Sequence, residues 1–298
     1  MQVPSHVEYE RATSVEHALM LLGRPDHRVL AGGHSLIPMM KLRLAQPGVL
    51  VDINGLAELA YIRLDGGHLR IGAMARHADL LDSAAAGGHF PIFRDAERVV
   101  ADPIVRLWGT IGGSLCQADP SEDLSAVFAA VRAIAVIRGQ AGDREVPVRE
   151  FHLGPYETVV GPGELLAEIR VPVPDHGGTG SAYEKVARRV GDWSVAAAGA
   201  VLRLDQGTVE QAGIGLTAVG AEHFVAAEAE DFLRGQPAAE ENFKAAAEIA
   251  AEHCHPVVDQ RGPEDYKRHL VAELTTRALR RAAGRARERA AERTGKTP

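Results

Sequence analysis

Short runs of apolar residues alternate with polar, glycine-rich connections through the first part of the chain. Apolar positions at helical spacing over 15–22, preceded by Thr13 and Ser14, predict an amphipathic helix that ends at Gly23. Three short apolar runs predict strands beside this helix: 7–9, 28–31 and 49–53. This alternation of strand and helix is typical of a small α/β unit.

From about residue 60 the pattern changes to paired strands and further apolar helices. Residues 61–64 and 68–73 flank the turn sequence Asp65-Gly66-Gly67, and they therefore predict a β-hairpin. Helices are predicted from His77 to the cluster at 84–88, at 92–100 and at 123–131, and strands at 133–138 and 165–171. These elements predict a mixed α+β unit after the small α/β unit.

The clearest linker lies where Pro172 and Pro174 precede the run 176–180. Beyond it the pattern predicts antiparallel strands at 181–187, 194–204 and 208–219, and helices at 221–233, 238–253 and 264–289. We expect an α+β chain whose first domain spans 1–175, with subdomains at about 1–58 and 59–175. A C-terminal domain of three antiparallel strands and helices spans 181–285, and 286–298 is expected to be a disordered tail.

Composition and charge narrow the classes of function. The 298 residues are 46% hydrophobic and 24% charged, and the formal net charge is −7 with a pI near 6.0. This balance gives no long-range attraction to nucleic acid. Arginines gather only from Arg277 onward, where glutamates interrupt them, which predicts the solvated face and frayed end of a helix. No run of about 18 apolar residues occurs, so we expect a soluble, cytoplasmic protein without a membrane span.

The chain has two cysteines, Cys116 and Cys254. They lie far apart in a sequence without an apolar secretory segment, so a disulfide framework is not expected. Two cysteines are also too few to ligate an iron–sulfur cluster. The triplet His253-Cys254-His255 is a poor metal site, because consecutive side chains at a helix end point in different directions. We therefore expect no metal in this chain.

Two glycine pairs carry the candidate chemistry. They occur in Ala31-Gly32-Gly33-His34-Ser35 and in Thr110-Ile111-Gly112-Gly113-Ser114. Glycine tolerates positive φ and has no Cβ, so successive backbone N–H groups of such a turn can converge on a phosphate. One such pair is more often a plain turn, but two suit the diphosphate of a dinucleotide-like ligand. The G-x-G-x-x-G and P-loop patterns are both missing, which disfavours NAD and ATP as the tightly held ligand.

At these residues the chain resembles a known family, the FAD-binding (medium) subunits of molybdenum hydroxylases of the carbon monoxide dehydrogenase and xanthine dehydrogenase type. The resemblance rests on 29–36 with 38–43, on 102–106 with 109–114, 119–120 and 123–124, and on 183–185 with 191–194. Residues 256–259, Arg261 and 266–270 add weaker support. Together these segments extend over nearly the whole chain.

The resemblance implies an FAD-binding domain of the vanillyl-alcohol-oxidase/PCMH type at 1–175 and a CO dehydrogenase flavoprotein-like C-terminal domain at 181–285. Asp123 would bind a sugar or ribityl hydroxyl, Leu166 and Lys185 would lie against the flavin, and Val100 would line the adenine side. The implied set of residues around noncovalent FAD is Val29, Leu30, Ala31, Gly32, Gly33, His34, Ser35, Leu36, Val100, Thr110, Ile111, Gly112, Gly113, Ser114, Asp123, Leu166, Lys185 and Trp193.

Three of these residues have alternative interpretations. Lys185 would bring a cation to the N1–O2 edge of the flavin and raise its potential, or it is a lysine on an exposed strand edge. Trp193 would approach the flavin and gate the electron acceptor, or it is a core tryptophan at the start of a strand. His34 belongs to a Gly-Gly-His-Ser sequence that also resembles the covalent flavin site of vanillyl-alcohol and berberine-bridge-type oxidases.

The resemblance implies an oxidoreductase subunit that is inactive on substrate alone and has no catalytic residue of its own. A large subunit would hold molybdopterin and a small subunit the [2Fe-2S] clusters, in a dimer of heterotrimers with quinone, NAD or oxygen as the electron acceptor. We expect the complex in the cytoplasm or at the inner face of the membrane. The alternatives are a self-contained flavin oxidase with FAD linked at His34 and a scaffold protein that has lost the flavin.

Overall fold

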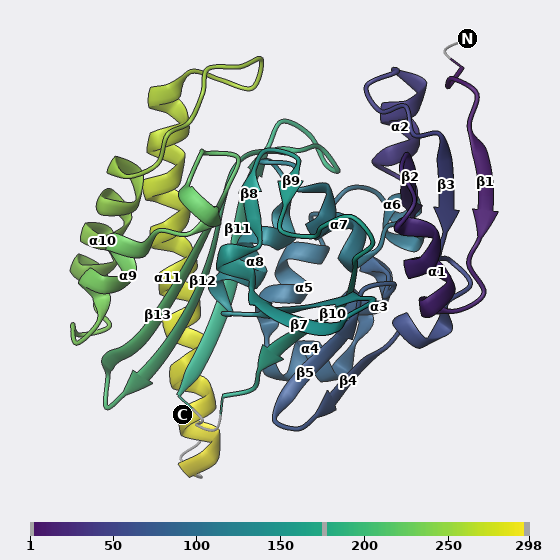
Figure 1. Cartoon of the computed structure of the whole chain (residues 1–298). Helices are drawn as coiled ribbons and strands as arrows, with labels where there is room; N and C mark the ends of the chain where they lie inside the picture. The colour runs from purple at the N-terminus through teal and green to yellow at the C-terminus, as the bar shows by residue number, and fades with distance from the viewer. Residues whose placement is uncertain (1–2, 175–177, 295–298) are drawn as a thin grey trace.

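The computed structural model describes residues 3–174 and 178–294. Figure 1 shows a small N-terminal subdomain at the right, a mixed middle subdomain, and a C-terminal domain whose helices form the left side of the molecule. The middle subdomain lies between the other two and contacts both. This arrangement confirms the α+β fold predicted from the sequence.

A parallel sheet with strand order β1–β3–β2 forms the N-terminal subdomain. Its elements are β1 (Glu8–Arg11), α1 (Val15–Leu22), β2 (His27–Leu30), α2 (Leu36–Lys41), β3 (Val49–Asp52) and the 3-10 turn η1 (Ala57–Leu59). Helix α1 has the predicted bounds, because the Ser14 hydroxyl accepts a hydrogen bond from the N–H of His17 and caps its first turn. Its apolar face is buried against the sheet.

The middle subdomain combines an antiparallel sheet of order β4–β5–β10–β6–β7 with six short helices. Its strands are β4 (Ile62–Asp65), β5 (His68–Gly72), β6 (Ile134–Gly139), β7 (Gly142–Pro147) and β10 (Leu165–Pro172), with η2 (Val148–Glu150) and the small hairpin β8 (His152–Gly154) and β9 (Glu157–Thr158). Its helices are α3 (His77–Asp82), α4 (Ala84–His89), α5 (Pro91–Glu97), α6 (Pro103–Trp108), α7 (Ile111–Gln117) and α8 (Asp123–Ala130). The predicted hairpin at 61–73 is confirmed.

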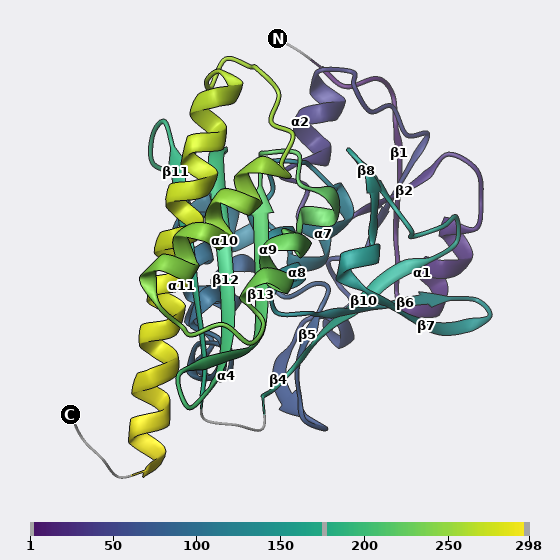
Figure 2. The ribbon, with the colours of Figure 1, turned by 90° about the vertical axis from the view of Figure 1, so that its left-hand side faces the viewer.

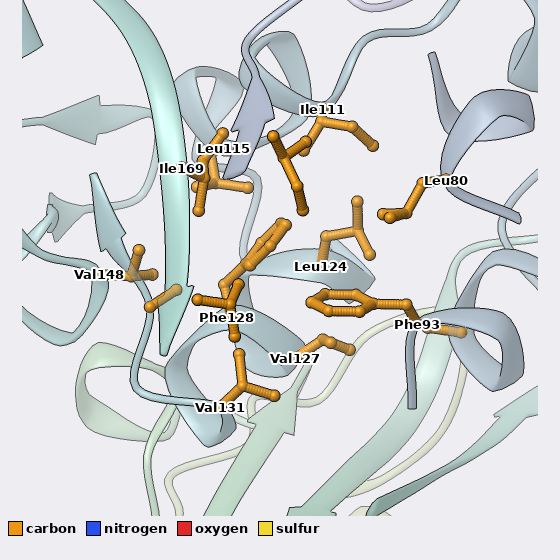
Figure 3. Close-up of a cluster of buried hydrophobic side chains, with 14 of the residues drawn as sticks. Leu80, Phe93, Ile111, Leu115, Leu124, Val127, Phe128, Val131, Val148 and Ile169 are labelled. Carbon is orange, nitrogen blue, oxygen red and sulfur yellow. The ribbon is translucent and has the colours of Figure 1, made fainter. Parts of the chain in front are cut away.

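The core of this subdomain fixes the positions of α7 and α8. Figure 3 shows Phe93 of α5 and Phe128 of α8 with their rings turned toward each other, and the ring centroids lie 5.3 Å apart. Ile111 and Leu115 of α7 lie in the same cluster. Because these side chains are fully buried, the polar residues at the ends of α7 and α8 are held on a rigid base.

The C-terminal domain is an antiparallel sheet of order β11–β12–β13 with helices on one face. Its elements are β11 (Thr179–Ala187), β12 (Ser194–Asp205), β13 (Thr208–Thr217), η3 (Glu222–Phe224), α9 (Ala227–Leu233), α10 (Glu240–Glu252) and α11 (Glu264–Thr294). Figure 2 shows α11 lying along this sheet. The other face packs on α8, so closely that a Cβ at Gly215 would lie 2.0 Å from the carbonyl oxygen of Ala126.

Buried ion pairs also join the two domains. Glu230 of α9 is 3% exposed and binds Arg149 at 2.6 Å and Arg132 at 3.0 Å, both from the middle subdomain. Arg285 of α11 donates to Asp95 of α5 at 3.1 Å. The expectation that the C-terminal arginines form a solvated helix face is therefore wrong for Arg285, because its guanidinium pairs with a carboxylate across the domain junction.

Several predicted helices are divided or shortened. The backbone of Ser83 is extended and its hydroxyl accepts from the N–H of Ala86, so α3 ends and α4 begins within the predicted helix at 77–88. The helix predicted at 92–100 ends at Glu97. The helix predicted at 221–233 begins only at Ala227, because His223 and Phe224 before it have positive φ.

The predicted linker and the predicted C-terminal tail each lie partly outside the described residues. Residues 175–177 of the predicted linker lie outside the described residues, and β11 begins already at Thr179. Helix α11 continues to Thr294, so the expected disorder from 286 onward is wrong for 286–294, whereas 295–298 lie outside the described residues. Arg289 holds this part of α11 against the middle subdomain, because its guanidinium donates to the backbone carbonyls of His89 and Gly88. Within 3–174 and 178–294, no helix has the length and hydropathy needed to cross a bilayer.

Candidate functional site

A cavity of about 410 Å³ lies where the N-terminal subdomain, the middle subdomain and the C-terminal domain meet. Its walls come from the turn after β2, from the segment through α6 and α7 to the start of α8, and from β11 with the loop that follows it. The predicted site residues that line it are Val29, Ala31, Gly32, Gly33, His34, Ser35, Leu36, Val100, Thr110, Gly113, Ser114, Asp123, Lys185 and Trp193. Most of the predicted set is thus brought together from distant parts of the sequence.

Four predicted residues do not line this cavity. Leu30 ends β2, and Ile111 is fully buried in the middle core. Gly112 packs against the residue that follows β5, since a Cβ there would lie 2.5 Å from the Cβ of Ala73. Leu166 of β10 is 2% exposed within the same core. The apolar side chains among these residues therefore stabilise the walls of the cavity from behind.

The turn after β2 presents unpaired backbone donors. Gly33 has a φ of +77°, which glycine adopts without strain, and a Cβ at Gly32 would lie 2.1 Å from the carbonyl oxygen of Trp108. Among the described residues, no protein acceptor faces the N–H groups of residues 32–35. Successive free N–H groups in a glycine turn form a cradle for an anion such as a phosphate. This segment fits the diphosphate of a dinucleotide.

The second glycine pair has a different role from the one predicted. Residues 111–117 are helix α7, and Thr110 is its N-cap. The N–H groups of residues 111–114 all donate within the protein, to the carbonyls of Ala75, Ala73 and Thr110 and to the Thr110 hydroxyl. The prediction of a turn is therefore wrong, because this pair lies in the first turn of a helix and its N–H groups are already paired, whereas contact of Thr110, Gly113 and Ser114 with FAD stays a prediction. The glycines instead let the first turn of α7 pack closely, and Gly113 leaves the cavity wall without a side chain.

Asp123 and Lys185 form a buried ion pair at the cavity wall. The Lys185 ammonium lies 2.7 Å from the Asp123 carboxylate, and the two side chains are 4% and 7% exposed. Asp123 also accepts hydrogen bonds from the hydroxyls of Tyr183 at 2.6 Å and Ser194 at 2.8 Å. The interpretation of Lys185 as a lysine on an exposed strand edge is wrong. Asp123 binds side chains of the C-terminal domain and thereby fixes the cation in the cavity wall.

Two buried acidic groups near the cavity were not singled out from the sequence. His77 lines the cavity and lies 3.0 Å from the carboxylate of Glu97, which is fully buried. Burial raises the pKa of Glu97, and the pKa of His77 is also raised because attraction to Glu97 outweighs the opposing effect of burial. Glu122, the N-cap of α8, also lines the cavity, and burial raises its pKa. The only sequence signal for Glu122 is an acid at the start of an apolar helix.

Trp193 and Cys116 are two further residues of the cavity wall that the sequence analysis discussed. Trp193 lines the cavity and remains 45% exposed, so the interpretation as a core tryptophan is wrong. Its loop closes on the middle subdomain, where a Cβ at Gly191 would lie 3.2 Å from the carbonyl oxygen of Ala101. Cys116 also lines the cavity, and burial raises the pKa of its thiol to about 12, so it is not a thiolate nucleophile at neutral pH.

The fold and this cavity are those of a two-domain protein that binds a nucleotide cofactor where the domains meet. Comparison with known proteins makes the class specific. Residues 5–174 match the family described as FAD binding domain in molybdopterin dehydrogenase, and residues 181–282 match the CO dehydrogenase flavoprotein C-terminal domain. The chain therefore belongs to the FAD-binding subunits of the molybdopterin dehydrogenase family, and FAD is the cofactor of its first domain.

Individual relatives agree over nearly the full length. The carbon monoxide dehydrogenase medium chain of Hydrogenophaga pseudoflava is 41% identical over 285 residues, which are 95% of this chain and 99% of the relative. The 6-hydroxypseudooxynicotine dehydrogenase complex subunit alpha of Paenarthrobacter nicotinovorans is 36% identical, over 95% of this chain and 97% of the relative. A solved carbon monoxide dehydrogenase structure from Hydrogenophaga pseudoflava has a TM-score of 0.92 at 43% identity, over 95% of this chain and 99% of that one.

Proposed function

We propose that this chain is the electron-transfer subunit of a heterotrimeric molybdenum hydroxylase, of the carbon monoxide dehydrogenase or xanthine dehydrogenase type. Electrons would arrive from [2Fe-2S] clusters of a small partner subunit and leave for an external acceptor: a quinone, NAD or oxygen. The observation that carries the proposal is the cavity itself, which combines a free N–H cradle at 32–35 with the buried Lys185–Asp123 pair. When bound there, FAD supplies the exchange of electrons.

The side chains of this chain have positioning and electrostatic roles. The turn at 32–35 would hold the diphosphate without a lysine, through backbone donors alone. Lys185 would place its positive charge against the flavin edge that gains electron density on reduction, which raises the potential. Asp123 holds Lys185 in place, and since this carboxylate already accepts two hydroxyl groups, it would contact a ribityl hydroxyl only by sharing an oxygen.

The chain also has features of a subunit that works with partners. Its two cysteines are too few to ligate the clusters that would feed the flavin. Helix α6, beside the cavity, buries none of its side chains, and Ile104, Leu107 and Trp108 are each more than half exposed. An exposed apolar surface of this kind is typical of a protein interface. We therefore propose that a large molybdopterin subunit and a small [2Fe-2S] subunit complete a cytoplasmic or membrane-associated dimer of heterotrimers.

The substrate would be determined outside this chain. Two relatives of similar length and identity carry names that refer to different substrates, carbon monoxide in one and 6-hydroxypseudooxynicotine in the other. A shared medium subunit would serve both reactions if it handles only electrons. The residues that recognise substrate would then lie in the large subunit.

Expression of the chain alone and together with its two partner subunits tests this proposal. We expect the isolated chain to bind FAD but to leave it oxidised when candidate substrates are added anaerobically. The complete complex should reduce the same flavin with its own substrate. Turnover of an organic substrate by the isolated chain would contradict the proposal and would favour a self-contained flavin oxidase, in which His34 at the cavity wall is the linkage site.

A further inference from the structure

A second cavity, of about 300 Å³, shares no lining residue with the first one. It is lined by the hairpin after η2 and by the loop that follows β13, including His152, Leu153, Ala218, Glu222 and Phe224. Leu153 is 59% exposed and the Glu222 side chain 91%, so the cavity opens to solvent. None of its lining residues belongs to the predicted FAD site.

The backbone around this second cavity is strained. Ala118, Ala218, His223 and Phe224 line it and all have positive φ, a conformation that costs free energy in residues with a Cβ. Strain of this kind persists only where the surrounding structure holds it, and it is concentrated at functional sites. The second cavity also lies next to the FAD site, so a short chain of side chains can connect the two.

His152 is the buried polar residue of the second cavity. Only 5% of the residue is exposed, and its Nδ1 has no hydrogen-bond partner among the described residues. Its Nε2 lies 3.2 Å from the carbonyl oxygen of Leu115, which can only accept, so Nε2 carries the proton. Nδ1 is therefore a lone pair without a donor. A hydrogen-bond donor has to reach this buried nitrogen to satisfy it.

A chain of hydrogen bonds leads from His152 to the FAD cavity. His152 Nε2 lies 3.3 Å from the Ser125 hydroxyl, and that hydroxyl donates at 2.6 Å to the Glu122 carboxylate. The Ser114 hydroxyl donates to the other Glu122 oxygen at 2.7 Å. Glu122 and Ser114 both line the FAD cavity. His152 thus donates toward Ser125 and Ser125 donates to Glu122, which accepts, so both donors point from the second cavity toward the first.

We propose that His152, Ser125 and Glu122 form a proton relay between solvent in the second cavity and the FAD site. The inference rests on the proposed function, since it takes FAD to be bound and to change its redox state in the first cavity. Reduction of a flavin takes up protons as well as electrons. Partner subunits assembled beside the FAD cavity, as proposed above, would shield the flavin from bulk water, and the relay would then supply its protons.

The transfer is balanced over three hops. A solvent proton binds to His152 Nδ1, while the Nε2 proton passes to the Ser125 oxygen. The Ser125 hydroxyl proton passes in turn to Glu122, which becomes a neutral acid at the wall of the FAD cavity. No electron moves along this chain. When an acceptor that takes only electrons reoxidises the flavin, each hop reverses and every hydrogen bond returns to its starting direction.

The charges around the relay suit this task. Burial raises the pKa of Glu122, which makes this carboxylate a better proton acceptor than a solvated one, and lowers the pKa of His152 to about 4, so His152 is neutral at rest. Asp123, Tyr183 and the His77–Glu97 pair face Glu122, whereas His223 and Glu222 are near His152. The ammonium of Lys185 pairs with Asp123 at 2.7 Å, and within residues 3–174 and 178–294 no ion pair joins a lysine or arginine to Glu122.

Proton release on reoxidation tests the relay. The FAD-loaded full chain, assembled with its partners, is reduced and then mixed with ferricyanide, which takes electrons but no protons. Flavin absorbance follows the electrons and a pH indicator follows the protons. Ser125→Ala and His152→Asn should each slow proton release on the order of a hundredfold, the size of a lost general acid–base step. Ser121→Ala removes a neighbouring hydroxyl outside the chain of hydrogen bonds and should match the wild type.

Two results would overturn the relay. One is wild-type proton release in both variants with FAD still bound. The other comes from nitrogen-15 NMR of the FAD-free chain, where a proton on Nδ1 of His152 instead of Nε2 would reverse the direction of the hydrogen bonds. The NMR measurement does not depend on FAD, so it tests the relay separately. A wild-type chain that binds no FAD would contradict the proposed function itself.

Discussion

Lys185 and Asp123, 62 positions apart in the sequence, form an ion pair of 2.7 Å that joins the C-terminal sheet to the first residue of α8. Tyr183 and Ser194 bind the same carboxylate from the neighbouring positions of the sheet. The pair therefore has two effects at once. It fixes the C-terminal domain against the FAD-binding domain, and it sets the charge of the cavity wall.

Removing the cation should separate these effects. Lys185→Met keeps the length of the side chain but leaves Asp123 buried without its charged partner, which should lower the free energy of unfolding by about 3 kcal/mol. FAD should also bind more weakly, because the cavity loses its positive charge. Urea unfolding and flavin fluorescence titration measure the two quantities. Lys244→Met, an exposed lysine on α10, is the matched control and should change neither.

Gly32 should tolerate no side chain. In Gly32→Ala the new Cβ would lie 2.1 Å from the Trp108 carbonyl oxygen, so the cradle at 32–35 must shift. We expect a loss of about 1–3 kcal/mol in the free energy of unfolding and a lower FAD content after purification. Gly88→Ala is the control, because a Cβ there meets nothing within 4 Å in helix α4. Equal FAD content in the two variants would show that the turn does not hold the cofactor.

His152 should make the stability of the chain depend on pH in a defined window. Burial lowers its pKa from 6.5 to about 4. Between these pH values the imidazole of the unfolded chain is therefore protonated, whereas that of the folded chain is not. The contribution is fully present above pH 6.5 and is lost as the pH falls toward 4, by about 3 kcal/mol in total. Urea unfolding of the wild type and His152→Asn between these pH values measures it. The difference in free energy between the two proteins should shrink in acid, and a constant difference would refute the burial of a neutral His152.

Glu230 should hold the two domains together. Glu230→Gln removes the charge that neutralises Arg132 and Arg149 at the domain junction, and we expect a loss of about 3 kcal/mol in the free energy of unfolding. Scanning calorimetry should show a lower unfolding temperature. Asp231→Asn is the neighbouring control, because its 71% exposed side chain forms an ion pair with Arg234 at the surface, and it should have a much smaller effect than Glu230→Gln. An equal shift in both variants would assign the effect to helix α9 in general.

The sequence predicted the local elements better than the contacts between them. Helix α1 was predicted with its true bounds because Ser14 and Gly23 mark its ends in the sequence. The second glycine pair was misread as a turn, since Gly-Gly occurs both in turns and where a helix packs against a strand. Only the three-dimensional position of Ala73 distinguishes the two for Gly112.

The pairing of buried polar side chains could not be predicted from sequence patterns. His77 and Glu97 are 20 positions apart on separate helices, and nothing in their local sequence marks them as a buried pair. Asp123 and Lys185 were both identified by resemblance, but their ion pair was not, because the pairing depends on how the C-terminal sheet packs on α8. Leu166 was placed against the flavin by resemblance, whereas the sheet order puts its side chain in the core.

Acid precipitation of the purified chain tests whether it holds FAD without a covalent bond. We expect one equivalent of FAD in the supernatant, with its absorbance spectrum intact and no flavin on the precipitated protein. Flavin retained on the protein and lost in His34→Ala would contradict the noncovalent site and identify a covalent oxidase. A purified chain that has no flavin absorbance and takes up no added FAD would contradict the claim altogether.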